Sequence, residues 1–249
     1  MERETVSVME IFTSLQGEGP ELGARHLFVR FYGCNRRCVY CDTEAALKLS
    51  GPCRIEQTPG RGDFRERPNP LNLEEVAHLI LSGSVQAGGI DALTLTGGEP
   101  LLYAPFLREL LPLLDHRFPC LLETNGLLSD ALQSVLPWID VVSMDVKIPS
   151  ATGEAADWEG HRRFLQTGGA KIGYVKTVLS PDVKEDELHL LAELIRSGGC
   201  PPLVLQPVSG SERDRSWIER LFDIQAGLRE AGIDSVRIIP QVHKLLGVL

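Results

Sequence analysis

Short apolar runs alternate with longer helical patterns along almost the whole chain. Seven of the runs have the length and composition of strands, at 26–32, 92–96, 120–124, 141–146, 172–179, 203–206 and 236–239. Helical patterns separate them at 73–81, 106–114, 130–136, 161–166, 185–197 and 212–231. This alternation predicts βαβ units with parallel strands. An earlier apolar run over 6–12 predicts an additional edge strand.

Seven parallel strands are one fewer than a closed eightfold barrel contains. We therefore expect an α/β fold that is an open, partial (β/α) barrel, with a flat doubly wound sheet as the alternative. The length of 249 residues and the hydrophobic content of 43% suit a single domain over 1–249. Pro, Gly and Arg concentrate over 48–70, which predicts an inserted solvated loop in preference to an anion site.

Charge and hydropathy exclude several classes of function. The net charge of −9 argues against a broad nucleic-acid-binding face. No apolar run approaches the roughly 20 residues of a membrane span. The charged start, Met1-Glu2-Arg3-Glu4, lacks the apolar segment of a secretory signal. We expect a cytoplasmic protein without nucleic-acid or membrane partners, whose six cysteines are reduced.

Polar and glycine-rich segments directly follow six of the predicted strands. They are 34–43, 96–100, 123–126, 143–147, 206–209 and 240–244. In parallel βα folds the carboxyl ends of the strands meet at one face, where the chemistry collects. The sequence therefore predicts one large site at the mouth of the barrel.

Three cysteines with the spacing C-x3-C-x2-C, Cys34, Cys38 and Cys41, follow the first core strand. Iron–sulfur clusters take thiolate ligands, usually four, so three cysteines leave one iron open to another ligand. A structural zinc site normally has four Cys or His ligands. Cys53 could supply a fourth, so a non-catalytic zinc-binding module stays open as an alternative. The other two cysteines share no ligand spacing.

The cysteine motif, the aromatic Tyr40 before its last cysteine, and Thr-Gly-Gly-Glu-Pro over 96–100 resemble the radical S-adenosylmethionine (SAM) superfamily. The resemblance implies a 4Fe–4S cluster on the three cysteines, whose open iron chelates SAM. It also implies an electron donor such as flavodoxin or ferredoxin. The fourth strand departs from a Ser-Pro-Lys pattern that many relatives carry. The implied SAM contacts are Tyr40, Asp42, Gly98, Glu99, Ser143, Asp145, Lys147, Gln206, Pro207, Val208 and Ser209.

Within that superfamily the chain is similar to the 7-carboxy-7-deazaguanine synthases. The segments that carry this similarity are 10–19, 28–35, 41–43, 206–209 and 241–244. The resemblance implies conversion of 6-carboxy-5,6,7,8-tetrahydropterin to 7-carboxy-7-deazaguanine with loss of ammonia, in queuosine and 7-deazapurine biosynthesis. It also implies a homodimer and a Mg²⁺ ion at Thr43. The implied substrate contacts are Leu15, Gln16, Gly17, Glu18, Arg30, Thr96, His243 and Leu249.

Physical chemistry supports several of these roles. Arg30 lies in an apolar strand, where an unpaired charge is costly, so it either binds the substrate carboxylate or forms a structural salt bridge. The Glu18 carboxylate suits the paired N–H donors of an amino-pyrimidinone edge. Mg²⁺ keeps several waters, so Thr43 and the substrate carboxylate make a plausible sparse site. His243 is either a substrate contact or a structural histidine.

Two further expectations concern the end of the chain and a rival activity. The apolar segment 245–249 predicts a packed tail, which either leaves Leu249 at the pocket or only covers the edge of the barrel. A radical SAM activase for a glycyl-radical enzyme shares the cysteine motif and is the nearest alternative. The Gln-Gly-Glu-Gly segment at 16–19 and Arg30 favour a small-molecule pocket over such an activase.

Overall fold

In the computed structural model, which describes residues 5–249, ten strands form one continuous sheet. Along the chain they are β2 (Val8–Leu15), β3 (Arg25–Phe31), β4 (Cys53–Glu56), β5 (Phe64–Arg67), β7 (Ala92–Gly97), β8 (Cys120–Thr124), β9 (Val141–Asp145), β10 (Ile172–Leu179), β11 (Leu203–Pro207) and β12 (Val236–Ile238). Their order in the sheet is β12-β11-β10-β9-β8-β7-β3-β2-β4-β5. Two short strands, β1 (Thr5–Val6) and β6 (Leu71–Asn72), pair separately.

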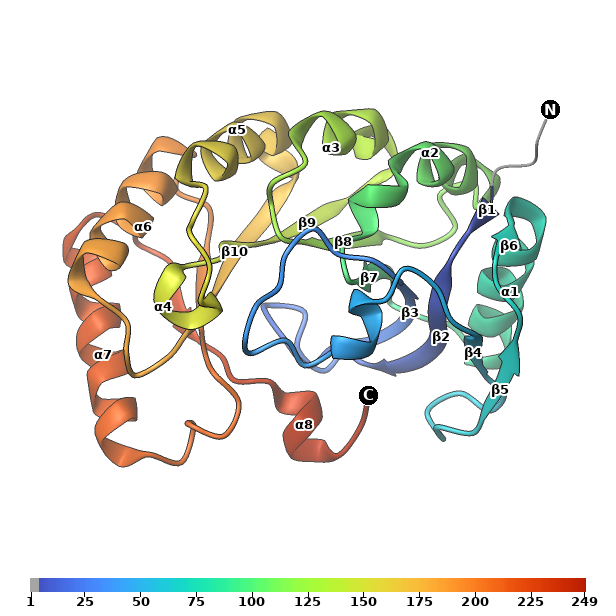
Figure 1. Cartoon of the computed structure of the whole chain (residues 1–249), viewed down its shortest axis with the longest axis horizontal. Helices are drawn as coiled ribbons and strands as arrows, with labels where there is room; N and C mark the ends of the chain where they lie inside the picture. Colours follow the sequence, from blue (N-terminus) through green and yellow to red (C-terminus); the bar gives the residue numbers. More distant parts are fainter. Residues whose placement is uncertain (1–4) are drawn as a thin grey trace.

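The seven predicted parallel strands are confirmed as one run from β3 to β12. β12 and β5 lie at opposite ends of the strand order, so the curved sheet stays open. Figure 1 shows the longer helices arranged around the outside of the sheet. A flat doubly wound sheet would carry helices on both faces, so that alternative is wrong and the open partial barrel is confirmed.

Six helices follow the helical patterns of the sequence. They are α1 (Leu73–Gln86), α2 (Ala104–Leu113), α3 (Ser129–Val135), α5 (Trp158–Gly168), α6 (Glu185–Ser197) and α7 (Arg215–Glu230). The short helices α4 (Pro149–Thr152) and α8 (Val242–Leu246) were not predicted. Short 3-10 turns complete the set: η1 (Glu44–Leu47), η2 (Pro100–Tyr103), η3 (Leu136–Trp138) and η4 (Gly169–Lys171).

Local sequence explains where the first helix begins. The Asn72 side chain accepts a hydrogen bond from the Glu75 backbone N–H at 3.0 Å, and the Glu75 side chain accepts one from the Asn72 N–H at 2.9 Å. This reciprocal capping box satisfies two donors that a helix start leaves unpaired. The apolar face of α1 then packs on the sheet through Ile80, which is fully buried.

Within the predicted loop 48–70, residues 53–56 and 64–67 form the two strands of a β-hairpin, which the sequence did not predict. β4 pairs with β5 in antiparallel orientation, and Cys53 and Ile55 are buried. The connection between the strands contains Gly60 and Gly62, both with positive φ. β4 also pairs with β2, so β2 lies inside the sheet and the predicted edge position is wrong.

The apolar core lies between the outer face of the sheet and the helices. Leu107 of α2, Leu132 of α3, Phe164 of α5 and Leu191 of α6 are fully buried there. This packing leaves the inner face of the sheet free to carry polar side chains. None of the helices described over residues 5–249 combines the length and the hydrophobicity of a membrane-spanning segment.

Candidate active site

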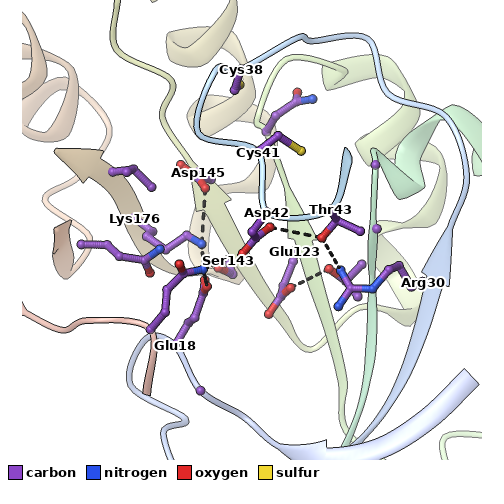
Figure 2. Close-up of a pocket in the computed structure, with 18 of the residues that line it drawn as sticks. Glu18, Arg30, Cys38, Cys41, Asp42, Thr43, Glu123, Ser143, Asp145 and Lys176 are labelled. Carbon is purple, nitrogen blue, oxygen red and sulfur yellow. Dashed lines mark hydrogen bonds and ion pairs between the residues drawn. The ribbon is translucent and has the colours of Figure 1, made fainter. Parts of the chain in front are cut away.

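One pocket collects side chains from all six strand-end segments. It lies at the carboxyl ends of the parallel strands, and Figure 2 shows many of the side chains that line it. Two of the predicted site residues, Glu99 and Pro207, do not line it. The predicted residues that do are Leu15, Gln16, Gly17, Glu18, Arg30, Cys34, Cys38, Tyr40, Cys41, Asp42, Thr43, Thr96, Gly98, Ser143, Asp145, Lys147, Gln206, Val208, Ser209, His243 and Leu249.

A row of polar residues crosses the inner face of the sheet. Glu10 of β2 is the register partner of Arg30 of β3, and Arg30 is the register partner of Thr96 of β7. The Thr96 hydroxyl donates a hydrogen bond to Glu123 Oε2 at 2.7 Å, and Glu123 of β8 pairs in register with Ser143 of β9. Residues opposite each other on adjacent strands project from the same face. The row therefore presents Arg30, Thr96, Glu123 and Ser143 to one pocket.

Arg30 is anchored by two neighbours. Its Nε donates to Glu10 Oε1 at 2.8 Å, and one Nη donates to the Thr43 hydroxyl at 3.3 Å. The structural salt bridge that the sequence left open is therefore present, with Glu10. The guanidinium still lines the pocket, with 19% of the side chain exposed. Arg30 can thus hold its ion pair and face a ligand at the same time.

Glu18 occupies the opposite side of the pocket in a charged network. Its carboxylate pairs with the Lys176 ammonium and accepts a hydrogen bond from Gln241 Nε2 at 2.6 Å. Burial alone would raise the pKa of Glu18, but the Lys176 charge and the Gln241 hydrogen bond outweigh it and hold the pKa below its usual value. Glu18 is therefore an ionised hydrogen-bond acceptor in the pocket.

A second carboxylate, Asp145, links Lys176 to the side chains near the cysteine loop. Lys176 Nζ lies 3.3 Å from Asp145 Oδ2, and Lys147 Nζ lies 2.9 Å from the same atom. Burial opposes ionisation of Asp145, but the two lysines hold its pKa below the usual value. Lys147 also donates to the Tyr40 hydroxyl at 3.0 Å. The chain of contacts runs from the cysteine loop to Glu18.

The three motif cysteines are free thiols that line this pocket. Figure 2 places Cys38 and Cys41 on the loop that covers one side of it. Within residues 5–249 the three sulfurs do not form a set whose atoms all lie within 4.8 Å of one another. Three thiols on one pocket can supply three of the four thiolate positions of an iron–sulfur cluster.

The fourth zinc ligand suggested by the sequence is not at the pocket. Cys53 and Cys120 are buried in the core, Cys200 is exposed, and none of the three lines the pocket. Burial raises the pKa of the Cys34 and Cys38 thiols, so binding iron there would have to displace protons.

Close approach of the Gly33 backbone explains why position 98, in the Gly-Gly-Glu-Pro segment, is glycine. A Cβ atom on Gly98 would lie 1.9 Å from the Gly33 carbonyl oxygen, so only glycine lets β7 end against the cysteine loop. The Glu99 carboxylate points into the protein and accepts hydrogen bonds from Thr124 Oγ1 at 2.9 Å and the Asn125 N–H at 2.8 Å. Burial raises the pKa of Glu99 to about 7. Glu99 therefore braces the ends of β7 and β8 from behind the pocket.

The end of the chain returns to the pocket. The Ser14 hydroxyl donates to the Leu249 carbonyl oxygen at 2.6 Å. Leu245 and Leu246 are 53% and 58% exposed, so the predicted packing of this tail is wrong. His243 packs against Gly17, where a Cβ atom would lie 2.2 Å from the imidazole Nδ1. Burial lowers the pKa of His243, which favours the neutral ring.

Asp42 and Thr43 lie between the cysteine loop and α8. The Thr43 hydroxyl donates to Asp42 Oδ1 at 3.1 Å, while Asp42 Oδ2 contacts Gln241 Nε2 at 2.8 Å and Lys244 Nζ at 3.2 Å. The ligand atoms of Glu18, Asp42 and His243 come within 4.8 Å of one another. Lys176 and Lys244 already pair with the two carboxylates, so their charges are balanced.

Six polar residues of the pocket were not among the predicted contacts: Arg36, Glu123, Thr124, Asn125, Lys176 and Gln241. Gln16 Nε2 donates to Glu123 Oε1 at 2.9 Å, so Glu123 joins two predicted substrate residues, Gln16 and Thr96. Lys176 carried a usable signal, because it is a charge inside the apolar run 172–179, as Arg30 is inside its own strand.

Comparison with known proteins agrees with this geometry. The model of the radical SAM superfamily matches residues 28–195. A 7-carboxy-7-deazaguanine synthase of Geobacter sulfurreducens is 39% identical, over 100% of both chains. One from Methanopyrus kandleri is also 39% identical, over 97% of this chain and 93% of its own.

Solved structures support the fold. The crystal structure of QueE from Escherichia coli superposes with a TM-score of 0.61 and 20% identity, over 95% of this chain and 94% of the other. The matched superfamily region contains the three cysteines and most of the polar row, and the full-length similarity extends to both ends of the pocket. The chain therefore belongs to the radical SAM superfamily and, within it, to the 7-carboxy-7-deazaguanine synthase family.

Proposed function

We propose that this chain is a radical SAM lyase that converts 6-carboxy-5,6,7,8-tetrahydropterin to 7-carboxy-7-deazaguanine with loss of ammonia, in the biosynthesis of queuosine and other 7-deazapurines. One observation carries the proposal: the row that contains Arg30, Thr96 and Glu123 faces the three free cysteines across a single pocket. A substrate anchored on the row would have its reactive ring toward the cysteine loop. We also propose that residues 1–249 act as one domain.

Cys34, Cys38 and Cys41 would hold a 4Fe–4S cluster, and their free thiols and shared pocket fit it. The cluster and SAM, when bound, supply the radical that abstracts hydrogen. The neighbouring polar groups would orient SAM: Tyr40, Asp42, Gly98, Ser143, Asp145, Lys147, Gln206, Val208 and Ser209. Glu99 and Pro207 would act indirectly, because neither lines the pocket.

The substrate would lie between Arg30 and Glu18. Arg30 already uses Nε on Glu10, which leaves the end of its guanidinium for the substrate carboxylate. Glu18 is ionised and can accept the paired N–H groups of the amino-pyrimidinone edge. The other substrate contacts would come from around these two: Leu15, Gln16, Gly17, Thr96, His243 and Leu249.

Thr43 would contribute to a Mg²⁺ site together with the substrate carboxylate. Its hydroxyl donates to Asp42 and accepts from Arg30, so one lone pair can still face a metal ion. Because the protein offers so few ligands, water and substrate oxygens would complete the octahedron that Mg²⁺ prefers. The ion would then be held firmly only when substrate is present.

The alternatives fit the pocket less well. A zinc module needs four ligands, whereas Cys53, the suggested fourth, is buried in the core and does not line the pocket. An activase must admit a segment of another protein, whereas this pocket is lined by Arg30, which suits a carboxylate, and by Glu18, which suits N–H donors of a small ligand. We further propose a homodimer in the reducing cytoplasm that takes electrons from a small donor such as flavodoxin or ferredoxin.

The test is anaerobic turnover of the reconstituted protein with SAM, reductant and 6-carboxy-tetrahydropterin, with and without Mg²⁺. We expect a product with the mass of 7-carboxy-7-deazaguanine and one ammonia per turnover, formed faster with Mg²⁺. SAM cleavage without this product would reject the substrate assignment. Equal rates after chelation of Mg²⁺ would reject the metal site alone.

A further inference from the structure

We propose that Arg54, in the hairpin inserted over 48–70, is a positioning residue for the substrate carboxylate. It would act by holding Glu10, which in turn fixes Arg30. The inference rests on the proposed role of Arg30, and it gives a function to the arginine-rich insertion. Arg54 itself does not line the pocket.

The strand register places the three residues in one line. Glu10 of β2 is the partner of Arg54 on one side, in β4, and of Arg30 on the other side, in β3. Side chains of register partners project from the same face of a sheet and lie close enough to interact. The polar row of the pocket therefore continues outward from Arg30, through Glu10, to the inserted hairpin.

Both oxygens of the Glu10 carboxylate are occupied. Oε1 accepts from Arg30 Nε at 2.8 Å, and Oε2 accepts from Arg54 Nη1 at 3.2 Å. Only 5% of the Glu10 side chain is exposed, so water cannot easily replace either partner. A carboxylate fixed at both oxygens holds the Arg30 guanidinium in one orientation, with its free end toward Thr43 and the pocket.

The hairpin is built to hold Arg54 in place. The Arg54 guanidinium stacks over the Phe64 ring of β5, 4.2 Å from its centroid. The hairpin is also fastened to β2, because Glu56 Oε2 accepts a hydrogen bond from the Thr13 N–H at 2.8 Å. Its turn is closed by the Thr58 hydroxyl, which donates to Asp63 Oδ2 at 2.8 Å.

A matched pair of variants tests the idea. Arg54→Met keeps a long stem over Phe64 but removes the charge and the hydrogen bond to Glu10. Arg61→Met makes the same chemical change at an exposed position between β4 and β5. Members of one ion-pair network are energetically coupled, so Arg54→Met should raise KM for the substrate roughly tenfold, and Arg61→Met should leave it unchanged.

A ligand without the carboxylate distinguishes a specific effect of Arg54 on Arg30 from general disruption of the pocket. Tetrahydropterin, which lacks the 6-carboxylate, can be measured as a competitive inhibitor of each variant. If Arg54 acts through Arg30, Arg54→Met should leave the inhibition constant of tetrahydropterin and uncoupled SAM cleavage unchanged while KM rises. Equal weakening of both ligands, or no change in KM, would overturn the proposal.

Arg30→Ala separates this inference from the proposed function. A strong rise in KM for Arg30→Ala, with none for Arg54→Met, rejects only the inference. An unchanged KM for Arg30→Ala rejects the proposed role of Arg30 itself. If Arg54→Met loses iron or native circular dichroism, Glu10→Gln and Arg54→Lys replace it, and the same comparison of the two ligands decides the outcome.

Discussion

Lys176 and Glu18, 158 positions apart in the sequence, form an ion pair inside the pocket. The same ammonium lies 3.3 Å from Asp145 Oδ2. One cation therefore balances a carboxylate that we assign to the substrate and another that we assign to SAM. The pKa of Lys176 lies well above its usual value, because these carboxylates outweigh the effect of burial. Lys176 is a permanent charge in the site.

Replacing Lys176 by Met should leave both carboxylates without their shared cation. Truncating one member of a buried charge pair typically costs about 2–5 kcal/mol, so kcat/KM should fall by roughly thirtyfold or more. Lys176→Arg keeps the charge and is the control. Kinetics with 6-carboxy-tetrahydropterin measure the effect, and wild-type kcat/KM in Lys176→Met would remove this residue from the site.

The cluster should need no cysteine outside the motif. Cys53, Cys120 and Cys200 do not line the pocket, so a triple Ala variant should still bind four irons and four sulfides per chain, the content of one 4Fe–4S cluster. Cys38→Ala should lose the cluster. Iron and sulfide analysis after anaerobic reconstitution distinguishes the two, and a folded triple variant without iron would contradict the ligand assignment.

The Thr43 hydroxyl should mediate the effect of Mg²⁺. Thr43→Val preserves shape but removes the oxygen, so stimulation by Mg²⁺ should disappear and the apparent metal affinity should fall by about tenfold or more. Thr43→Ser retains the hydroxyl and should respond to Mg²⁺ as the native chain does. Titration of the initial rate with Mg²⁺ measures this, and an unaltered response in Thr43→Val would place the ion elsewhere.

His161 should make the fold less stable as the pH falls below neutrality. It is buried, its Nε2 contacts the Asn125 carbonyl oxygen at 3.2 Å, and burial lowers its pKa to about 4. Between pH 6.5 and 4 the His161 ring is protonated in the unfolded chain but stays neutral in the folded protein. The free energy of unfolding should therefore fall with decreasing pH, by up to about 1.4 kcal/mol per pH unit.

The comparison for this prediction is His161→Gln, which retains a donor for the Asn125 carbonyl. Denaturant unfolding of the anaerobic holoprotein at pH 7 and pH 5 gives the slope for each chain. The variant should lose less stability over this interval than the native chain. Buried His26 also has a lowered pKa, so the unfolding free energy of both the native chain and His161→Gln should depend on pH. The prediction is contradicted if the two proteins lose the same stability between pH 7 and pH 5.

The sequence predicts the sheet well because its strands are apolar runs with abrupt polar ends. The runs 120–124 and 172–179 coincide with β8 and β10. The hairpin at 53–67 was not predicted from the sequence, because each of its strands has only four residues. Strands this short do not show a clear alternating pattern beside a glycine-rich turn. Its pairing with β2 is a long-range contact that local sequence does not encode.

The pocket was predictable to the extent that strand ends determine it. Side chains after parallel strands converge whatever their partners are, so the rule found Cys34, Thr96 and Ser143 together. It could not give the direction of a side chain. Glu99 turns inward because its carboxylate accepts hydrogen bonds from the Thr124 hydroxyl and the Asn125 N–H. The sequence alone does not show these hydrogen bonds.

The most direct test of the account is transfer of hydrogen from the proposed substrate. 6-Carboxy-tetrahydropterin carrying deuterium at C6 would be turned over anaerobically with SAM and reductant, and both products analysed by mass. The account predicts deuterium in 5′-deoxyadenosine together with 7-carboxy-7-deazaguanine. Unlabelled 5′-deoxyadenosine, formed at the same rate with and without the pterin and without the deazaguanine, would contradict it.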